Sequence, residues 1–113
     1  MSDCIFCKIA AGEIPSKKAY EDERVFAFYD LEPQAPVHVL IIPKEHIASV
    51  AEITEENSSI AAHIFEVAAR LAKELGLEGG FRLVANTGAD GGQTVQHLHV
   101  HLLGGRSMKW PPG

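Results

Sequence analysis

The segment QHLHVHLL, residues 96–103, constrains the fold more than any other stretch of the chain. Histidines and apolar residues alternate along it with a strict period of two. Successive side chains of a β-strand point to opposite faces of a sheet, so the alternation predicts a strand over residues 95–103. The apolar positions would join the core, and the histidines, His97, His99 and His101, would share the other face.

Three imidazoles on one strand face indicate a metal-binding or catalytic role more than a generic polar surface. Each ring carries polar nitrogens that need hydrogen-bond partners when buried. A single metal ion fits all three poorly. Same-face residues of a strand are about 6.6 Å apart, whereas zinc holds nitrogen ligands at about 2.0 to 2.1 Å. A catalytic imidazole assisted by its neighbours is the second interpretation, and a plain polar strand face is the third.

The composition narrows the class of protein and of partner. The chain has 113 residues, 46% hydrophobic and 22% charged, as expected for one soluble globular domain over residues 1–113. The formal net charge of −5 argues against a nucleic-acid polymer or an anionic membrane as main partner but is compatible with a single nucleotide. We find no secretory signal pattern, no apolar run of membrane-spanning length and only two cysteines, so we expect a cytoplasmic protein.

The apolar pattern predicts an antiparallel sheet packed on one long helix. That helix is expected over residues 54–75, with Thr54 as its N-cap and Gly76 as its stop signal. A short helical turn is expected over residues 4–11. Strands are expected on both sides of the acidic turn in KAYEDERVFAFYD, in VHVLIIP, in FRLVANTG and in the histidine segment. The predicted fold class is therefore α+β, with about five strands.

Further segments outside the three alternating histidines could carry chemistry. Cys4 and Cys7 are half of a metal site or two free thiols; a thioredoxin-like redox pair needs a preceding strand, for which residue 4 leaves no room. His38 lies in the strand VHVLIIP and could face the same cleft, and His46 follows that strand. His63 lies off the apolar stripe of the long helix and is expected in solvent. The glycine-rich TGADGGQT could offer N–H groups to a phosphate or be a flexible turn.

Residues 97 to 103 resemble the motif His-φ-His-φ-His-φ-φ, where φ is apolar, that defines the histidine triad (HIT) superfamily of nucleotide hydrolases and transferases. The segments IFCKIAAGEIPSKKAYEDE, AFYDLEPQAPVHVLIIPKEHI and GGQTVQHLHVHLLGGRSMKWPPG resemble its Hint branch almost from end to end. The long helix is the least distinctive part. The resemblance implies a HIT-like fold whose antiparallel sheet continues across a homodimer.

The resemblance also implies a purine nucleoside phosphoramidase, which cleaves the P–N bond of AMP–amine or GMP–amine conjugates. His99 would attack the α-phosphorus and form a covalent nucleotidyl-imidazole, which water hydrolyses to the nucleoside monophosphate. His101, with His38 on the neighbouring strand, would position the phosphate and its proton. Asn86 and Thr94 match positions that contact the phosphate and the leaving group, although many relatives have serine where Thr94 stands.

A nucleotide pocket is implied by the same comparison. Asp30 matches the carboxylate that takes the ribose hydroxyls, and Gln93 is expected among the nucleotide-binding residues. The residues that match the apolar slot for the purine are Phe6, Ile9, Ile14, Phe28, Tyr29 and Leu31.

The resemblance implies a zinc ion as well. In zinc-bearing relatives, two N-terminal cysteines join two histidines, and these positions match Cys4, Cys7, His46 and His97. Four filled ligand positions leave no open position for a substrate water, and some relatives lack both cysteines. The implied zinc is therefore structural, and the reaction needs no cofactor.

Two other functions stay open. One is a dinucleoside polyphosphate hydrolase, as in the Fhit branch, although the C-terminal GGRSMKWPPG favours the Hint branch. The other is a nucleotide-binding or zinc-binding interaction module whose catalysis is incidental, although the intact triad favours an enzyme. In related proteins the C-terminal tail approaches the active site of the partner subunit, so Trp110 is expected on the leaving-group side of that pocket unless it packs on its own chain.

Overall fold

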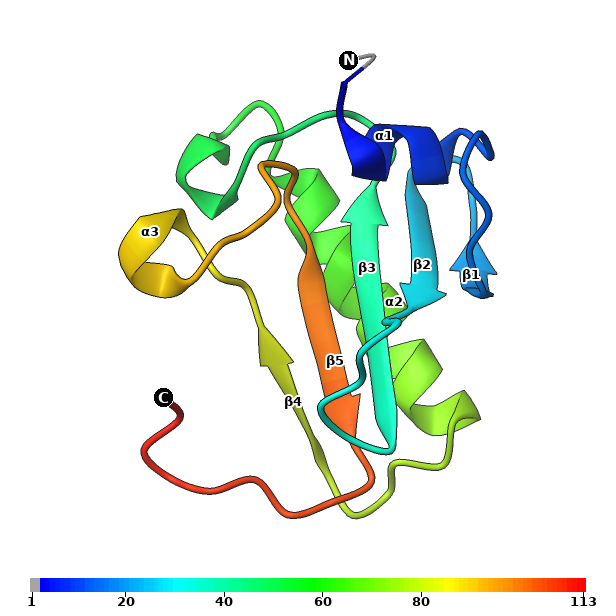
Figure 1. The fold of residues 1–113 in the computed structure, drawn as a ribbon, viewed down its shortest axis with the longest axis vertical. Helices are drawn as coiled ribbons and strands as arrows, with labels where there is room; N and C mark the ends of the chain where they lie inside the picture. The colour runs from blue at the N-terminus through cyan, green and yellow to red at the C-terminus, as the bar shows by residue number, and fades with distance from the viewer. Residues whose placement is uncertain (1–2) are drawn as a thin grey trace.

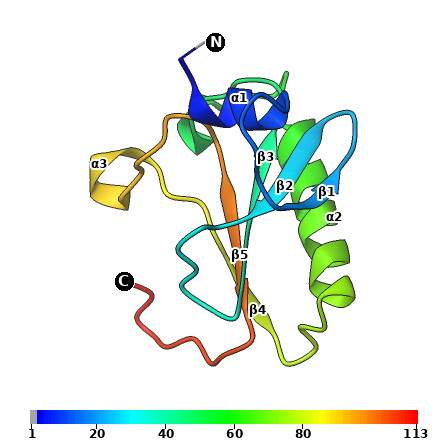
Figure 2. The same ribbon diagram turned by 45° about the vertical axis from the view of Figure 1, so that its right-hand side comes forward.

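Five strands form one antiparallel sheet in the order β1-β2-β3-β5-β4, and the long helix α2 lies along one face of it (Figures 1 and 2). The computed structural model describes residues 3–113. Its strands are β1 Lys18–Glu21, β2 Val25–Tyr29, β3 Val37–Pro43, β4 Phe81–Val84 and β5 Val100–Gly104. Its helices are α1 Ile5–Ala10, α2 Ser59–Glu74 and α3 Gly88–Gly91, with a 3-10 turn at Val50–Glu52. The predicted α+β class is confirmed.

The centre of the sheet is buried on both faces, which explains the apolar run over residues 39–42 of β3. Val39 and Ile41 pack in the cluster on the α2 side, and Leu40 and Ile42 pack in a second cluster on the opposite side. The α2-side core also contains the three apolar residues that alternate with the histidines, Leu98, Val100 and Leu102, as predicted. The second cluster lies beneath α1 and consists of Phe6, Ile9, Phe26, Phe28, Leu40 and Ile42.

Helix α2 begins later than the sequence predicts. The N-cap position is Ser58, so the prediction of Thr54 was wrong. The side chain of Asn57 intervenes: its Oδ1 accepts from the Thr54 N–H at 2.7 Å, and its Nδ2 donates to the carbonyl oxygen of Glu52 at 3.1 Å. A local turn of this kind competes with the helix for the same backbone groups. The end is as predicted, with Gly76 at φ +76°. Within residues 3–113, every helix is too short or too polar to span a lipid bilayer.

The last strand is also shorter than predicted, because only His101 of the three histidines lies within β5. The pairing of Ile41 with Val100 would place Pro43 opposite Leu98 if it continued. Proline has no N–H to donate, so the ladder ends there. Leu98 instead donates its N–H to the carbonyl oxygen of Ile47 at 2.6 Å. The apolar side chains still point to the α2 side after this loss of regular pairing, although His97, Leu98, His99 and Val100 are all buried.

The glycine-rich segment after β4 forms the one-turn helix α3, and the side chain of Gln93 ties it to the rest of the chain. Its Oε1 accepts from the Gly88 N–H at 3.0 Å. Its Nε2 donates to the carbonyl oxygens of Ala48 and Val95 at 2.8 and 2.9 Å. Gln93 therefore fixes the path of the chain just before the histidines.

Candidate active site and metal centre

The three histidines converge with α1 on the sheet face opposite α2. His97 and His99 are buried, at 0% and 5% exposure. The ring of Phe6, from α1, meets both edge-on, at centroid distances of 6.0 Å from His97 and 5.0 Å from His99. The ring of His101 lies 5.1 Å from that of His99. The structure thus brings the predicted catalytic histidines together beneath the N-terminal helix.

The hydrogen bond to His99 defines which of its nitrogens is free. Its Nδ1 lies 2.7 Å from the carbonyl oxygen of His97. A carbonyl oxygen can only accept, so Nδ1 carries the proton and Nε2 keeps its lone pair. A neutral ring with a free lone pair is the form that can attack an electrophile. The backbone of the segment before β5 therefore orients the His99 ring and directs its Nε2 lone pair away from the His97 carbonyl.

A second hydrogen-bonded chain sets the protons of His38 and His101. The Gln34 N–H donates to Nδ1 of His38 at 3.1 Å, so the proton of the neutral His38 ring lies on Nε2. That Nε2 lies 2.9 Å from Nδ1 of His101, which must then accept. Neutral His101 consequently carries its proton on Nε2. Burial lowers the pKa of His38, and burial with the nearby His99 and His38 lowers the pKa of His101 to about 4, so both rings are neutral at pH 7.

A separate cluster has the composition and spacing of a zinc site. The ligand atoms of Cys4, Cys7, His46 and His97 all lie within 4.8 Å of one another. Nδ1 of His97 is 3.3 Å from Sγ of Cys4 and 3.5 Å from Sγ of Cys7, and Nδ1 of His46 is 3.3 Å from Sγ of Cys7. Tetrahedral zinc with ordinary bond lengths separates sulfur and nitrogen ligands by about 3.6 Å. These residues therefore fit the ion with little adjustment.

The far side of the His97 ring supports the same assignment. Its Nε2 lies 2.8 Å from the carbonyl oxygen of Pro43, so Nε2 carries the proton and the Nδ1 lone pair faces the thiols. Metal-ligating histidines typically donate their other N–H to an acceptor in this way. Burial lowers the pKa of His97, which keeps the ring in the neutral form that a metal requires.

Asp30, His38 and His101 also bring their ligand atoms within 4.8 Å of one another. Oδ2 of Asp30 lies 3.6 Å from Nε2 of His38. The hydrogen bonds of this group favour proton transfer over metal binding, because Nδ1 of His38 accepts an N–H where a metal-bound histidine would donate one.

The predicted apolar slot is assembled only in part. Phe6, Ile9 and Phe28 lie in the cluster beneath α1, and Ile14 packs against it. Tyr29 packs on the α2-side core, beneath Lys17, whose Nζ lies 5.0 Å from the ring centre. Leu31 is 95% exposed on the loop before β3, Thr94 is exposed and Asn86 is half-buried, both near α3.

His63 lies apart from these groups, on α2. The sequence places it in solvent, but the side chain is only 23% exposed, and its Nε2 lies 2.6 Å from Oδ2 of Asp22. It therefore joins the helix to the turn between β1 and β2.

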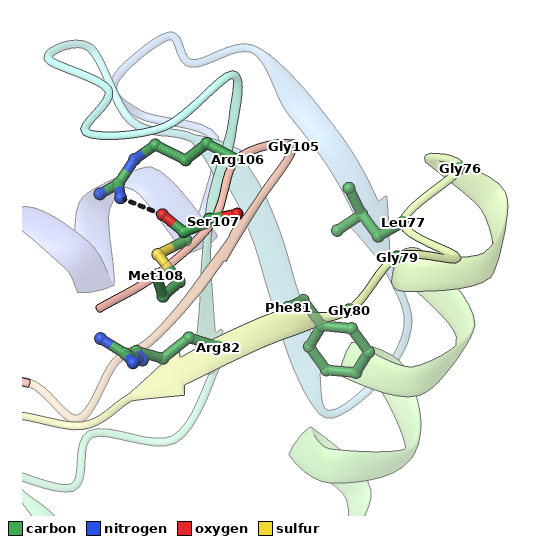
Figure 3. Close-up of a pocket in the computed structure, with 10 residues that line it drawn as sticks. All are labelled: Gly76, Leu77, Gly79, Gly80, Phe81, Arg82, Gly105, Arg106, Ser107 and Met108. Atoms are coloured by element: carbon green, nitrogen blue, oxygen red, sulfur yellow. Dashed lines mark hydrogen bonds between the residues drawn. The ribbon is translucent and has the colours of Figure 1, made fainter. Parts of the chain in front are cut away.

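A cavity of about 570 Å³ lies away from the histidines, where the end of α2, the start of β4 and the chain after β5 meet (Figure 3). Leu77, Phe81, Arg82 and Arg106 are among its walls, and none of the predicted site residues lines it.

Sequence reasoning did not single out Gln34 or Pro43, whose backbone groups fix the ring protons of His38 and His97. Every residue type carries a backbone carbonyl, so the sequence does not show which backbone group will bond a histidine. The prolines in these segments indicate only that the backbone there is conformationally restricted.

The comparisons with known proteins agree with this geometry. A family model described as "HIT domain" matches residues 11–108. A "14 kDa zinc-binding protein" of Zea mays is 52% identical over 114 residues, covering 99% of this chain and 89% of its own length. The crystal structure of a HIT family hydrolase from Legionella pneumophila is 53% identical with a TM-score of 0.96, covering 98% of this chain and all of its own.

A more distant structure, a histidine triad nucleotide-binding protein from Candida albicans, is 37% identical with a TM-score of 0.82 and covers 96% of this chain and 83% of its own. Identity at this level along nearly the whole chain, together with the match of the family model, establishes common descent. The chain belongs to the HIT domain family.

Proposed function

We propose that the protein is a nucleotide hydrolase of the HIT type, specifically a purine nucleoside phosphoramidase of the Hint branch. The observation that carries this proposal is the placement of His99, buried with Nδ1–H held by the His97 carbonyl and with Nε2 on the other side of the ring. The relatives described as a HIT family hydrolase and a histidine triad nucleotide-binding protein support the same class of reaction.

In the proposed reaction, Nε2 of His99 bonds to the α-phosphorus as the P–N bond to the amine breaks. The departing amine takes a proton, and the Nε2–H of neutral His101 is the donor that its hydrogen bond to His38 favours. Water then attacks phosphorus and gives one proton back to Nε2 of His101, the bond to His99 breaks, and the nucleoside monophosphate leaves. Atoms and charge balance without a redox cofactor.

The nucleotide would lie across the sheet face beneath α1. The purine would contact the apolar side chains there, and Asp30, beside His38, would accept the ribose hydroxyls. Asn86 and Thr94, before the histidines, are proposed to face the phosphate and leaving group. Gln93, whose amide bonds backbone groups of the same segment, remains a proposed nucleotide-binding residue. Leu31 and Tyr29 flank Asp30 in sequence and remain proposed base contacts.

The metal centre is proposed to be structural. Cys4, Cys7, His46 and His97 would hold one zinc ion, which when bound would link α1 to the segments that follow β3 and precede β5. The four donors fill a tetrahedral shell, so the ion would stabilise the fold rather than activate water. The cytoplasmic location stays a prediction.

A kinetic panel separates the candidate activities. We expect hydrolysis of AMP and GMP phosphoramidates to exceed that of a dinucleoside polyphosphate in kcat/KM. A preference for the dinucleoside polyphosphate would favour the alternative hydrolase. Tight nucleotide binding with no turnover of either substrate would instead favour an interaction module.

A homodimer is proposed because one edge of the sheet is apolar and unpaired in the single chain. β4 is an edge strand, and Phe81 at its start is 44% exposed. Phe65, on α2, is 61% exposed. An exposed edge strand beside apolar side chains needs cover, which a symmetric copy of the chain provides.

We expect Phe81→Glu to shift the protein from dimer to monomer at micromolar concentration, because it places a charge within the proposed contact. Light scattering during size-exclusion chromatography measures the mass. Val50→Glu is the control, since Val50 is similarly exposed at 47% but lies on the 3-10 turn after β3. A wild-type protein that is monomeric at this concentration would contradict the proposal.

Deleting residues 108–113 is expected to change the preference among amine leaving groups more than the affinity for AMP. Trp110 is 82% exposed in the single chain, so it does not pack on its own chain and is free to contact the partner. The measurement is kcat/KM for a series of AMP phosphoramidates, with Trp110→Ala separating the ring from the rest of the tail. An unchanged order of preference would exclude this role.

A further inference from the structure

Arg106 holds the loop that precedes β3. The pairing of Val37 with Gly104 brings the chain after β5 alongside residues 31–36. There the Nε of Arg106 donates to the carbonyl oxygen of Gln34 at 3.0 Å. Its Nη1 donates to the carbonyl oxygen of Ser107 at 3.1 Å, which fixes the guanidinium at the rim of the cavity (Figure 3).

A close backbone contact reinforces this hydrogen bond. Gly105 has φ +91°, a conformation that favours glycine. A Cβ atom at this position would lie 2.8 Å from Cβ of Pro36, which is closer than carbon atoms normally approach. Gly105 and Arg106 therefore press the segment after β5 directly against the loop.

The residue that Arg106 holds is the one that orients His38. The carbonyl of Gln34 accepts from Arg106, while the N–H of Gln34 donates to Nδ1 of His38 at 3.1 Å. The Gln34 side chain turns back to its own loop, where its Nε2 donates to the carbonyl oxygen of Glu32 at 3.1 Å. Within residues 3–113, the hydrogen-bonded link from Arg106 to the histidines therefore runs through the backbone of Gln34 and not through its side chain.

From this chain of contacts, we propose that Arg106 is a positioning residue that fixes the tautomers of His38 and His101. It touches neither ring. By holding the Gln34 backbone, it keeps the N–H aimed at Nδ1 of His38, which keeps the proton of His38 on Nε2 and that of His101 on its own Nε2. The catalytic purpose of that arrangement rests on the proposed hydrolase function, whereas the arrangement itself can be measured without substrate.

The direct test is nitrogen NMR of histidine-labelled protein, which distinguishes the protonated from the bare nitrogen of each ring. Wild-type His38 and His101 should both show the Nε2–H form. Arg106→Ala should give a mixture of tautomers at both rings, and Arg106→Lys, which keeps one donor, should restore part of the wild-type spectrum. Arg70→Ala is the matched control, because Arg70 is an exposed arginine that contacts Tyr20 with a hydrogen bond of 3.3 Å.

The kinetic consequence separates positioning from binding. Arg106→Ala should lower kcat for an AMP phosphoramidate about tenfold, a fraction of the 10² to 10⁴ that a positioned acid–base group supplies. KM should stay within about twofold, because the residue contacts no proposed nucleotide group. If this variant does not fold, Gly105→Ala, which pushes the segment off Pro36, is expected to give the same tautomer mixture.

Wild-type tautomers in a folded Arg106→Ala protein, or in Gly105→Ala where only that variant folds, would overturn the proposal. A wild-type protein with the expected tautomers but no phosphoramidase activity would defeat the proposed function and leave this inference standing.

Discussion

The His99→Ala variant is expected to lose phosphoramidase turnover while still binding AMP. Without the imidazole no nucleotidyl-enzyme can form, so kcat should fall on the order of 10⁵-fold or to background, as when other enzymes lose a covalent nucleophile. The apolar cluster beneath α1 and Asp30 remain in place, so calorimetric titration should still detect nucleotide binding.

The proposed covalent intermediate gives this prediction a second readout. Rapid acid quenching of wild-type enzyme during turnover, followed by mass spectrometry, should show one nucleotidyl group on the peptide that contains His99. The adduct should be absent from His99→Ala and present in His63→Gln, a histidine variant on the far side of the sheet. Near wild-type activity in His99→Ala would rule out the nucleophile.

The second large effect concerns the metal. Freshly purified, reduced protein should contain about one zinc per chain in S₂N₂ coordination. Cys4→Ser should then lose about 3 kcal/mol of metal-linked stability, which lowers the unfolding midpoint of a domain of this size by about 10 °C. The rate of phosphoramidate hydrolysis below that midpoint should change much less.

Serine is a discriminating replacement at this position. Sγ of Cys4 accepts from the Cys7 N–H at 3.4 Å and so caps α1. Serine is a favourable N-cap, so the variant keeps the cap and loses only the metal ligand. Chelated wild-type protein should unfold near the midpoint of the variant. Protein without zinc, or a variant with an unchanged midpoint, would contradict the structural role.

Sequence patterns predicted the elements whose signals are local. β3 matches its predicted bounds because the apolar run over residues 39–42 ends at Pro43. α2 ends at Glu74, just before Gly76, which adopts the left-handed conformation. The start of α2 was missed because Asn57 captures the N–H of Thr54, a choice that residue type alone does not decide. The predicted strand was longer than β5 because Pro43, which has no N–H to donate, lies on the neighbouring strand. The pairing of that strand with β5 is not known from the sequence.

The candidate site shows the same division. Spacing identified the three histidines. The family resemblance supplied the full set of predicted metal ligands and the role of His38 beside His101. The protons on these rings were not predictable, because they depend on the carbonyls of His97 and Pro43 and on the N–H of Gln34. Backbone groups of this kind become visible only when the chain is folded.

His97 belongs to two sites at once, through different parts of the same residue. Its ring faces the thiols, while its carbonyl holds the proposed nucleophile, His99. Every amino acid carries that carbonyl, so an evolving lineage can exchange the ring, together with the other three ligands, without removing the acceptor for Nδ1 of His99. Simultaneous replacement of all four ligands by well-packed apolar residues is therefore the rational route to a metal-independent protein. A single replacement would leave the remaining polar ligands buried without partners.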